Sequence, residues 1–417
     1  MTENIMVSVL CTAYNHEKFI EDAIKGVLKQ KTDFKFELII HDDASTDTTA
    51  EIIKKYEKKN PDIIHAILQA VNQYQQCNIY HSFLFPNAKG KYIAFCEGDD
   101  YWIDEEKLQK QVSFLESHEE YSMCMHNAIR LNYVSGKQDL LNTFPRDGTY
   151  TQKEQILAGL GTDFPAFASY LIRANLLDGI PAFFLASKVL DYPLRQYYAN
   201  CGKVYYFDKP MSVYRVSTPQ SYMKKTAEDQ LFYNNYTVEM IKFFEEFKQY
   251  AGEKFNALLK CKIISDYFGF CLSIHEKEGI NKALAEKLDI DMVKNCYYRL
   301  SPGYLDNSVL GILSNSDKIF IYGISRIAPI CKKQLEHAGI EIEGFVVSDG
   351  QVKVEVLEGK RVFYLSEVIT RYRKPGFVLA LQPINAAAVS GILDERGIDN
   401  YCQPYMVNSD RKAKELN

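Results

Sequence analysis

The chain of 417 residues lacks the marks of a membrane-spanning or disulfide-stabilised protein. No apolar run approaches the roughly 18 residues that a membrane span needs, and strand-like sequence begins near Met6 with no signal peptide before it. The ten cysteines form no CxxC pair and no Cys/His spacing typical of a metal site. Several lie in apolar runs, where a reduced cysteine acts as a small hydrophobe. We therefore expect a cytoplasmic protein, with peripheral attachment to the inner face of the plasma membrane left open.

A large positive charge is also absent, as are repeats and low-complexity segments. The formal net charge of -5 gives no electrostatic case for nucleic acid or an anionic membrane as the main partner. The apolar and charged fractions, 47% and 25%, are those of an ordinary soluble globular protein. The length predicts two or three domains.

The first 130 residues alternate strand and helix signals. Apolar runs typical of buried strands lie at 6–11, 36–40 and 92–96. Helical periodicity lies at 17–29 and 45–58. Because this alternation predicts a mainly parallel, doubly wound sheet, ligands are expected at the carboxyl ends of its strands. Polar groups follow all three runs, at 12–15, 42–43 and 97–100.

The segment Glu97-Gly98-Asp99-Asp100 is the most informative of these groups. Three carboxylates at the end of a buried strand repel one another, and leaving them unpaired in a partly dry cleft is costly. A hard divalent cation with oxygen ligands removes that cost, which favours Mg²⁺ or Mn²⁺. The alternative is an acidic turn, with Asp104 capping the following helix.

The rest of the chain predicts a helical segment and a second α/β unit. Residues 226 to about 300 look helical, and strands are expected at 319–323, 344–347 and 377–381. The turn from Gly323 to Ala328 has one glycine, which is weak evidence for dinucleotide binding. A structural or oligomerising appendage is the favoured alternative. We expect domains at 1–225, 226–315 (a helical linker) and 316–417.

Four segments, in order along the chain, resemble motifs of family 2 glycosyltransferases, which are inverting enzymes with the GT-A fold. The segments are Val7–Asn15; Asp42–Asp47; Lys89–Asp100; and Leu190–Leu194, followed by Gly202-Lys203 and Val213–Arg215. The resemblance covers roughly residues 5 to 220, and four ordered motifs are far more specific than one. The C-terminal unit is loosely similar to Rossmann-like domains fused to sugar-modifying enzymes, such as the N-terminal part of sugar O-acyltransferases.

This resemblance implies a fold and a nucleotide pocket. The expected architecture is a GT-A domain with a Rossmann-like, mainly parallel sheet, a helical middle segment and a small Rossmann-like C-terminal domain. Asp43 would accept a hydrogen bond from the uracil ring of a UDP-sugar. Thr12 and Tyr14 would line the same pocket, with Asn15 and Asp42 in the same donor-binding set.

The resemblance also implies catalytic and metal-binding roles. Glu97 stands where the first DxD aspartate touches the ribose, Asp99 where the Mn²⁺ or Mg²⁺ ligand sits, with Asp100 beside it. The ion would neutralise the departing diphosphate. Asp191 would be the general base; its alternative is a helix N-cap. Arg215 would face the diphosphate or anchor a loop.

Two residues depart from the family pattern. Glu97 is one methylene longer than the usual aspartate and still long enough to reach a ribose hydroxyl. The family often has a histidine soon after the Tyr-Arg pair, where this chain has Val216-Ser217-Thr218, so the metal would have fewer protein ligands. Tyr101 and Trp102 would either stack on a sugar or pack in the core.

We expect a metal-dependent glycosyltransferase that moves a sugar from a nucleotide donor, UDP-linked by preference, to a hydroxyl of a surface polysaccharide or lipid-linked glycan precursor. One alternative is a catalytically weak scaffold or binding protein in glycan assembly. A sugar nucleotidyltransferase is disfavoured, because the loop at 12–18 has no glycine to hold a nucleoside triphosphate. Self-association into a homo-oligomer is left open.

Overall fold

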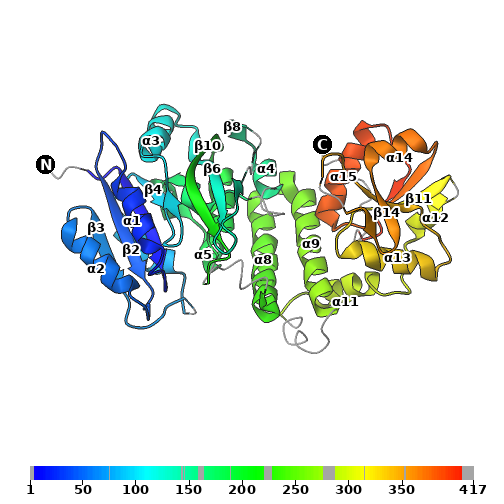
Figure 1. The fold of residues 1–417 in the computed structure, drawn as a ribbon, viewed down its shortest axis with the longest axis horizontal. Coiled ribbons are helices and arrows are strands. Elements are labelled where there is room, and N and C mark those ends of the chain that lie inside the picture. Colours follow the sequence, from blue (N-terminus) through cyan, green and yellow to red (C-terminus); the bar gives the residue numbers. More distant parts are fainter. Residues whose placement is uncertain are drawn as a thin grey trace. The chain divides into compact units, whose positions relative to one another are not determined.

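The computed structural model describes residues 4–74, 76–141, 144, 146–157, 164–187, 189–219, 228–275, 287–313, 315–351 and 354–405. The chain forms two compact units, residues 1–229 and 230–417 (Figure 1). The boundary expected between 225 and 226 lies outside the described residues, and a helical domain separate from the C-terminal one stays a prediction. No helix among the described residues is long and apolar enough to cross a membrane.

Within the described residues, the first unit is built on a 10-stranded mixed sheet. One half is parallel, in the order β3-β2-β1-β4, with β1 (Val7–Ala13), β2 (Phe36–Asp42), β3 (Ile64–Leu68) and β4 (Tyr92–Phe95). The other half runs through β9 (Leu171–Arg173), β6 (Tyr121–Asn132), β10 (Lys203–Val216) and β5 (Tyr101–Trp102), with β7 (Gln138–Leu140) beside β6 and β8 (Gly148–Tyr150) beside β10. The expected α/β architecture is confirmed.

Helices and short turns accompany this sheet. The helices are α1 (Ile20–Leu28), α2 (Thr49–Lys59), α3 (Lys107–Ser117), α4 (Gln152–Leu157), α5 (Ala182–Ala186) and α6 (Asp191–Cys201). The turns are η1 (Tyr80–Leu84), η2 (Phe85–Asn87), η3 (Phe167–Ser169) and η4 (Ala174–Gly179). The apolar stripe of α1 is buried in one core cluster with residues of β1 and β4, as its periodicity predicted.

Trp102 shows how tightly α1 lies against the rest of the unit. Its side chain is buried, and its indole N–H donates a 3.0 Å hydrogen bond to the carbonyl oxygen of Ala168. A Cβ at Gly26 of α1 would lie 2.9 Å from the Trp102 backbone nitrogen and oxygen, so only glycine permits this approach. These contacts fit the core-packing alternative for Trp102.

The second unit combines helices with a smaller sheet of order β13-β14-β12-β11-β15-β16. The strands are β11 (Lys318–Tyr322), β12 (Gly344–Val347), β13 (Val356–Leu357), β14 (Lys360–Tyr364), β15 (Pro375–Leu379) and β16 (Tyr401–Cys402). The helices are α8 (Gln230–Ala251), α9 (Asn256–His275), α11 (Ile290–Arg299), α12 (Asn307–Leu313), α13 (Ile327–His337), α14 (Leu365–Arg371) and α15 (Pro383–Glu395), with the turn η5 (Glu253–Phe255). The expected small α/β sheet is confirmed.

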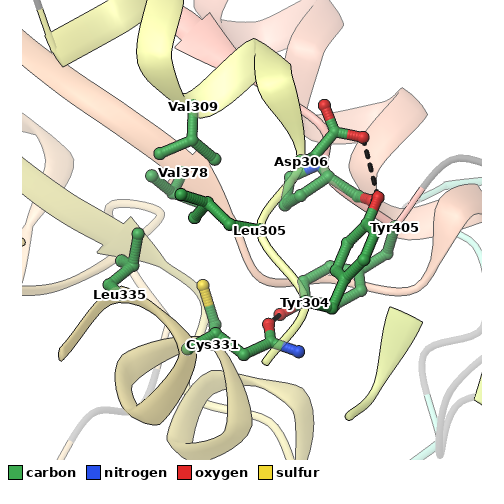
Figure 2. A pocket seen from close by; sticks show the side chains of 10 residues that line it. Tyr304, Leu305, Asp306, Val309, Cys331, Leu335, Val378 and Tyr405 are labelled. Atoms are coloured by element: carbon green, nitrogen blue, oxygen red, sulfur yellow. Dashed lines mark hydrogen bonds between the residues drawn. The ribbon is translucent and has the colours of Figure 1, made fainter. Parts of the chain in front are cut away.

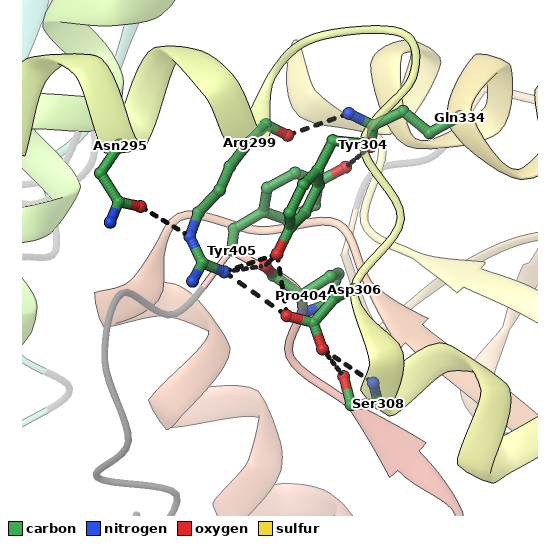
Figure 3. Close-up of polar contacts among 8 residues, drawn as sticks. All are labelled: Asn295, Arg299, Tyr304, Asp306, Ser308, Gln334, Pro404 and Tyr405. Atoms are coloured by element: carbon green, nitrogen blue, oxygen red, sulfur yellow. Dashed lines mark hydrogen bonds and ion pairs between the residues drawn. The ribbon is translucent and has the colours of Figure 1, made fainter.

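A polar network joins α11 to the end of this second sheet (Figure 3). The Arg299 guanidinium donates to the carbonyl oxygen of Pro404 at 2.8 Å and to the Tyr304 hydroxyl at 2.7 Å. Gln334 of α13 donates to the carbonyl oxygen of Arg299 at 2.9 Å and accepts from the Tyr405 hydroxyl at 2.7 Å. The network therefore fastens the helical segment to the sheet within one compact unit.

Candidate functional site

The polar segments after β1, β2 and β4 lie at one edge of the first sheet. Parallel pairing aligns Thr12 with His41 and Ala13 with Asp42. Two hydrogen bonds continue the ladder beyond the strands: Asp43 N donates to the Ala13 carbonyl oxygen and Gly98 N to that of Thr12, both at 2.9 Å. The structure thus brings together the three segments that the sequence pattern placed at strand ends.

Asn15 and Asp42 shape the two neighbouring loops. Asn15 has a positive φ of 55°, its backbone N–H donates to Ser45 Oγ at 2.9 Å, and its side-chain oxygen accepts from Thr46 N at 2.8 Å. Asp42 accepts from Ser45 N at 3.1 Å and from Ser45 Oγ at 2.5 Å. Asn15 therefore ties the loop after β1 to the loop after β2, whereas Asp42 holds Ser45 within the second loop. The donor-binding role of both residues stays a prediction.

Asp43 is buried and anchors the segment that follows β3. Its two carboxylate oxygens accept from Gln73 N at 2.7 Å and Tyr74 N at 3.1 Å. Its carbonyl oxygen accepts from the Asn72 side chain at 3.0 Å. Each carboxylate oxygen has a second lone pair, so these bonds leave capacity for a further donor. The contact with uracil stays a prediction.

Tyr80 also lies at this edge, although no motif or pattern in the sequence pointed to it. It opens the π-helical turn η1, a rare geometry often found at functional sites. Its hydroxyl lies 3.4 Å from Thr12 Oγ1, and its ring packs among Phe85, Phe95 and Phe167. Tyr14 is more than a third exposed, at 36%, and is thus open to a ligand.

The acidic cluster consists of Glu97, Asp99 and Asp100, with Asp191 facing Glu97. Glu97 and Asp99 are half-buried and Asp100 is buried. Burial, followed by the charges of Asp99 and Asp191, raises the pKa of Glu97 to about 8. Burial, with the charges of Asp99 and Glu97, also raises the pKa of Asp100 well above its usual value. Carboxylates in this state are stabilised by a nearby cation.

The donor atoms of this cluster fit a hard cation only in part. Asp100 Oδ2 is buried and has no hydrogen-bond partner, and oxygen donors suit Mg²⁺ or Mn²⁺. Among the described residues, however, no group of three or more His, Cys, Asp or Glu side chains has the arrangement of a metal site. Thr218, in the segment where the family often has a histidine, places its hydroxyl 3.4 Å from Asp99 Oδ2. Asp99 and Asp100 as metal ligands therefore stay a prediction.

Arg215 is buried against this cluster. Its guanidinium donates to the Asp99 carbonyl oxygen at 2.8 Å and to Asp22 Oδ2 at 2.5 Å, and it lies 4.4 Å from the centre of the Tyr101 ring. These contacts fit the loop-anchor alternative, since the hydrogen bonds already engage two sides of the guanidinium.

Asp191 is the first residue of α6 and is half-buried. Its Oδ1 accepts from the backbone N–H of Tyr192 at 2.7 Å, whereas the N-cap position belongs to Leu190. Burial raises the pKa of Asp191 above its usual value, opposed by that hydrogen bond and by the charge of Arg195. A carboxyl with a raised pKa beside an acidic cluster has the character of a general base.

The corresponding edge of the second sheet is the place where a nucleotide phosphate would be expected to bind in this unit. Gly323, with φ of 110°, makes the turn after β11. Helix α9 covers the neighbouring helix N-termini: Ser265 Oγ accepts from Ile384 N of α15 at 2.9 Å, and Arg326, before α13, donates to the Leu272 carbonyl oxygen at 3.3 Å. One backbone N–H and one guanidinium at this edge are thus already hydrogen-bonded to the chain.

A pocket in this unit lies among α12, α13 and β15 (Figure 2). Its polar lining is engaged internally: the Tyr304 hydroxyl donates to Asp306 at 2.8 Å, and Gln334 accepts from Tyr405. The remaining lining is mostly apolar, from Leu305, Val309, Leu335 and Val378. No charged group of the described lining is left to orient a polar ligand.

The first unit is thus an α/β domain whose polar segments gather where its parallel strands end, the edge at which such sheets commonly bind ligands. Residues 8–176 match the model of Glycosyl transferase family 2. The first unit thus contains a domain of this family, which confirms the family that the motifs predicted.

Several curated relatives share this region. The uncharacterized protein Rv1520 of Mycobacterium tuberculosis is 35% identical over 210 residues, which are 50% of this chain and 58% of that protein. The putative teichuronic acid biosynthesis glycosyltransferase TuaG of Bacillus subtilis is 36% identical over 110 residues, 26% of this chain and 42% of that protein. The UDP-Glc:alpha-D-GlcNAc-diphosphoundecaprenol beta-1,3-glucosyltransferase WfaP of Escherichia coli is 32% identical over 130 residues, 31% of this chain and 49% of that protein. The chain spans about half the length of these relatives.

Proposed function

We propose that this protein is an inverting, metal-dependent glycosyltransferase that moves a sugar from a UDP-sugar to a hydroxyl of a surface polysaccharide or a lipid-linked glycan precursor. The observation that carries the proposal is the acidic cluster beside Asp191, at the carboxyl edge of a family 2 sheet. The names of TuaG and WfaP support the substrate classes, because one refers to teichuronic acid biosynthesis and the other to a UDP-glucose donor and a diphosphoundecaprenol acceptor.

The chemistry follows from the roles of the side chains. Asp191 removes the proton from the acceptor hydroxyl, whose oxygen attacks the anomeric carbon from the face opposite the diphosphate. The new C–O bond forms as the bond to the diphosphate oxygen breaks, so a single displacement inverts the anomeric centre. Asp99 and Asp100 would hold a divalent cation, which neutralises charge on the leaving diphosphate. Asp43, Thr12 and Tyr14 bind the nucleoside.

The test is release of UDP from UDP-glucose and UDP-N-acetylglucosamine, with Mn²⁺, with Mg²⁺ and with chelator. We expect turnover only with a divalent cation, and a loss of about 100-fold or more in Asp191→Asn, the scale of general-base catalysis. Asp99→Ala is expected to abolish turnover whether or not the divalent cation is present. Equal turnover in chelator would contradict the metal role.

The scaffold alternative has one observation in its favour: the segment after Arg215 lacks the histidine common in the family, and the hydroxyl of Thr218 lies near Asp99 there instead. Under this alternative UDP-sugars raise the melting temperature, yet no sugar transfer occurs with any undecaprenyl-linked or polysaccharide acceptor. Thr218→His separates the two proposals, because added metal affinity raises the turnover of an enzyme and leaves a scaffold inactive.

A further inference from the structure

Arg195 places a positive charge deep inside the first unit. Its side chain is buried, at 1% exposure, and it lies four residues after Asp191 on α6. Residues four apart on a helix share one face, so Asp191 and Arg195 lie one turn apart on α6. Burying a guanidinium is costly unless an opposite charge and hydrogen bonds compensate for it. The burial of the Arg195 guanidinium therefore suggests that the charge of this residue has a role beyond packing.

Neutral groups hold the guanidinium in place. Nη1 donates to Gln155 Oε1 of α4 at 3.1 Å, and the guanidinium carbon lies 5.0 Å from the centre of the Tyr192 ring. Gln196 donates to the carbonyl oxygen of Gln155 at 2.9 Å, which fixes α4 against α6. Arg195 also hydrogen-bonds to the buried Tyr170. The electrostatic interaction with Asp191 supplies the opposite charge.

The other titratable groups that face Asp191 do not favour its ionised form. They come from four segments: Tyr80 of η1, Glu97 after β4, Tyr170 before β9 and Tyr214 of β10. Three are phenols that stay neutral at physiological pH, and Glu97, whose pKa is raised to about 8, repels the Asp191 carboxylate only where both groups are ionised. Of the groups named here, Arg195 is the one that favours a charged Asp191.

We propose that Arg195 is a positioning residue that keeps the Asp191 carboxylate ionised and ready to accept a proton. This inference rests on the proposed glycosyl transfer. Without the guanidinium, only backbone hydrogen bonds, such as that from Tyr192 N, oppose the effect of burial on Asp191, so the base is protonated over a wider pH range. The acid limb of the pH profile then moves to higher pH.

The experiment compares pH profiles of kcat/KM for UDP release in the full-length protein and three variants. Arg195→Met removes the charge, and Gln155→Glu keeps Arg195 but neutralises its charge with a new carboxylate. In both variants, we expect the acid limb of the profile to shift to higher pH by about one unit. At a fixed pH on that limb, kcat/KM then falls about tenfold. Arg195→Lys restores a cation and is expected to return the limb towards that of the wild type.

Arg173 provides the matched control, because its guanidinium donates to the carbonyl oxygens of Tyr121 at 2.7 Å and Leu115 at 2.6 Å. Arg173→Met is expected to lower the melting temperature without moving the acid limb. An acid limb at the wild-type pH in folded Arg195→Met or in Gln155→Glu would overturn the proposal.

A second readout does not depend on activity. The ¹³C carboxyl resonance of Asp191, assigned by its loss in Asp191→Asn, is expected to titrate about one pH unit higher in Arg195→Met. An unchanged midpoint overturns the role of Arg195. A different outcome is that the wild-type protein never releases UDP, while the titration midpoint of Asp191 still shifts in Arg195→Met. That outcome contradicts the proposed function but supports the electrostatic coupling between Arg195 and Asp191.

Discussion

The backbone N–H of Arg215 donates a 2.8 Å hydrogen bond to Oδ1 of Asp100, from β10 to the loop after β4. β5, which follows that loop, pairs antiparallel with β10 and aligns Val213 with Tyr101. The loop that carries the acidic cluster is therefore positioned by the backbone of β10. The guanidinium adds a second attachment to α1 through Asp22.

Replacing Arg215 by lysine removes the planar fork that bonds Asp22 and the Asp99 carbonyl oxygen together. Because the Asp22 side chain is half exposed, we expect a stability loss of about 0.5–1 kcal/mol. Asp22→Asn should cost a similar amount. The double variant should cost little more than either alone, since both changes break the contact between Arg215 and Asp22. Chemical denaturation of the three variants measures this coupling.

The same variants separate the anchor role of Arg215 from a diphosphate-binding role. A loop anchor predicts that Asp22→Asn and Arg215→Lys weaken UDP binding alike. A diphosphate ligand predicts that Arg215→Lys weakens UDP binding and spares uridine, with Asp22→Asn unaffected. Calorimetric titration with UDP and uridine distinguishes these outcomes.

Asp43→Asn tests the carboxylate that anchors the segment after β3. Both of its oxygens accept backbone N–H groups, and an amide offers one oxygen, which leaves either Gln73 N or Tyr74 N facing an NH₂ group. An unsatisfied buried donor costs about 1–3 kcal/mol. We expect a lower melting temperature and a weakened preference for UDP over GDP in thermal-shift assays. A variant as stable as the wild type would show that the two backbone bonds are dispensable.

The ends of the strands could be predicted from the sequence because the local alternation of apolar and polar residues determines them. The buried runs before Thr12, Asp42 and Glu97 alternate with helical stripes, and parallel pairing then brings their ends to one edge. That reasoning needs only the period of apolar residues and the direction of the connections. It identified the edge of the sheet at which the candidate site lies.

Contacts that depend on distant segments could not be predicted in this way. Tyr80 sits in a π-helical turn, and Arg195 looks like one polar residue of an amphipathic helix until α4 covers it. The segment at 216–218 drew attention only because it lacks a histidine, whereas in the structure the Thr218 hydroxyl lies 3.4 Å from Asp99 Oδ2. In each case tertiary packing, which a single sequence does not reveal, determines what the side chain touches.

The lowered pKa of Asp104 leads us to predict how the stability of the protein depends on pH. Its side chain is mostly buried; burial opposes its ionisation, but hydrogen bonds from Lys110 at 2.8 Å and Lys209 at 2.7 Å outweigh this and lower its pKa. A carboxyl whose pKa is lower in the folded state stabilises the protein above its unfolded pKa of about 3.9, and this contribution is lost as the pH falls. We expect Asp104→Asn to cost about 1 kcal/mol at pH 7, after allowance for solvent screening.

The difference between wild type and Asp104→Asn should shrink as the pH falls from about 5 to 2. Urea denaturation at a series of pH values measures it. Lys209→Met removes one of the two cations and serves as the control, with a smaller loss at pH 7 and the same convergence in acid. A difference that is constant with pH would mean that the carboxylate charge is not involved.

Gly26→Ala tests the approach of α1 to the backbone of Trp102. The new Cβ would lie 2.9 Å from the nitrogen and oxygen of Trp102, so helix or strand has to move. Forcing an extra methyl group into a packed interior typically costs about 1–3 kcal/mol, even though alanine favours a helix.

Gly179→Ala is the matched control in the same unit, because its Cβ would meet only the Tyr197 hydroxyl at 3.5 Å, an ordinary contact. Because Trp102 follows the acidic loop directly, we expect Gly26→Ala, and not the control, to weaken binding of UDP-sugars as well as to lower the unfolding midpoint. A stable variant with weakened binding would show that the shift is confined to the loop, whereas unchanged stability and binding would contradict the close packing.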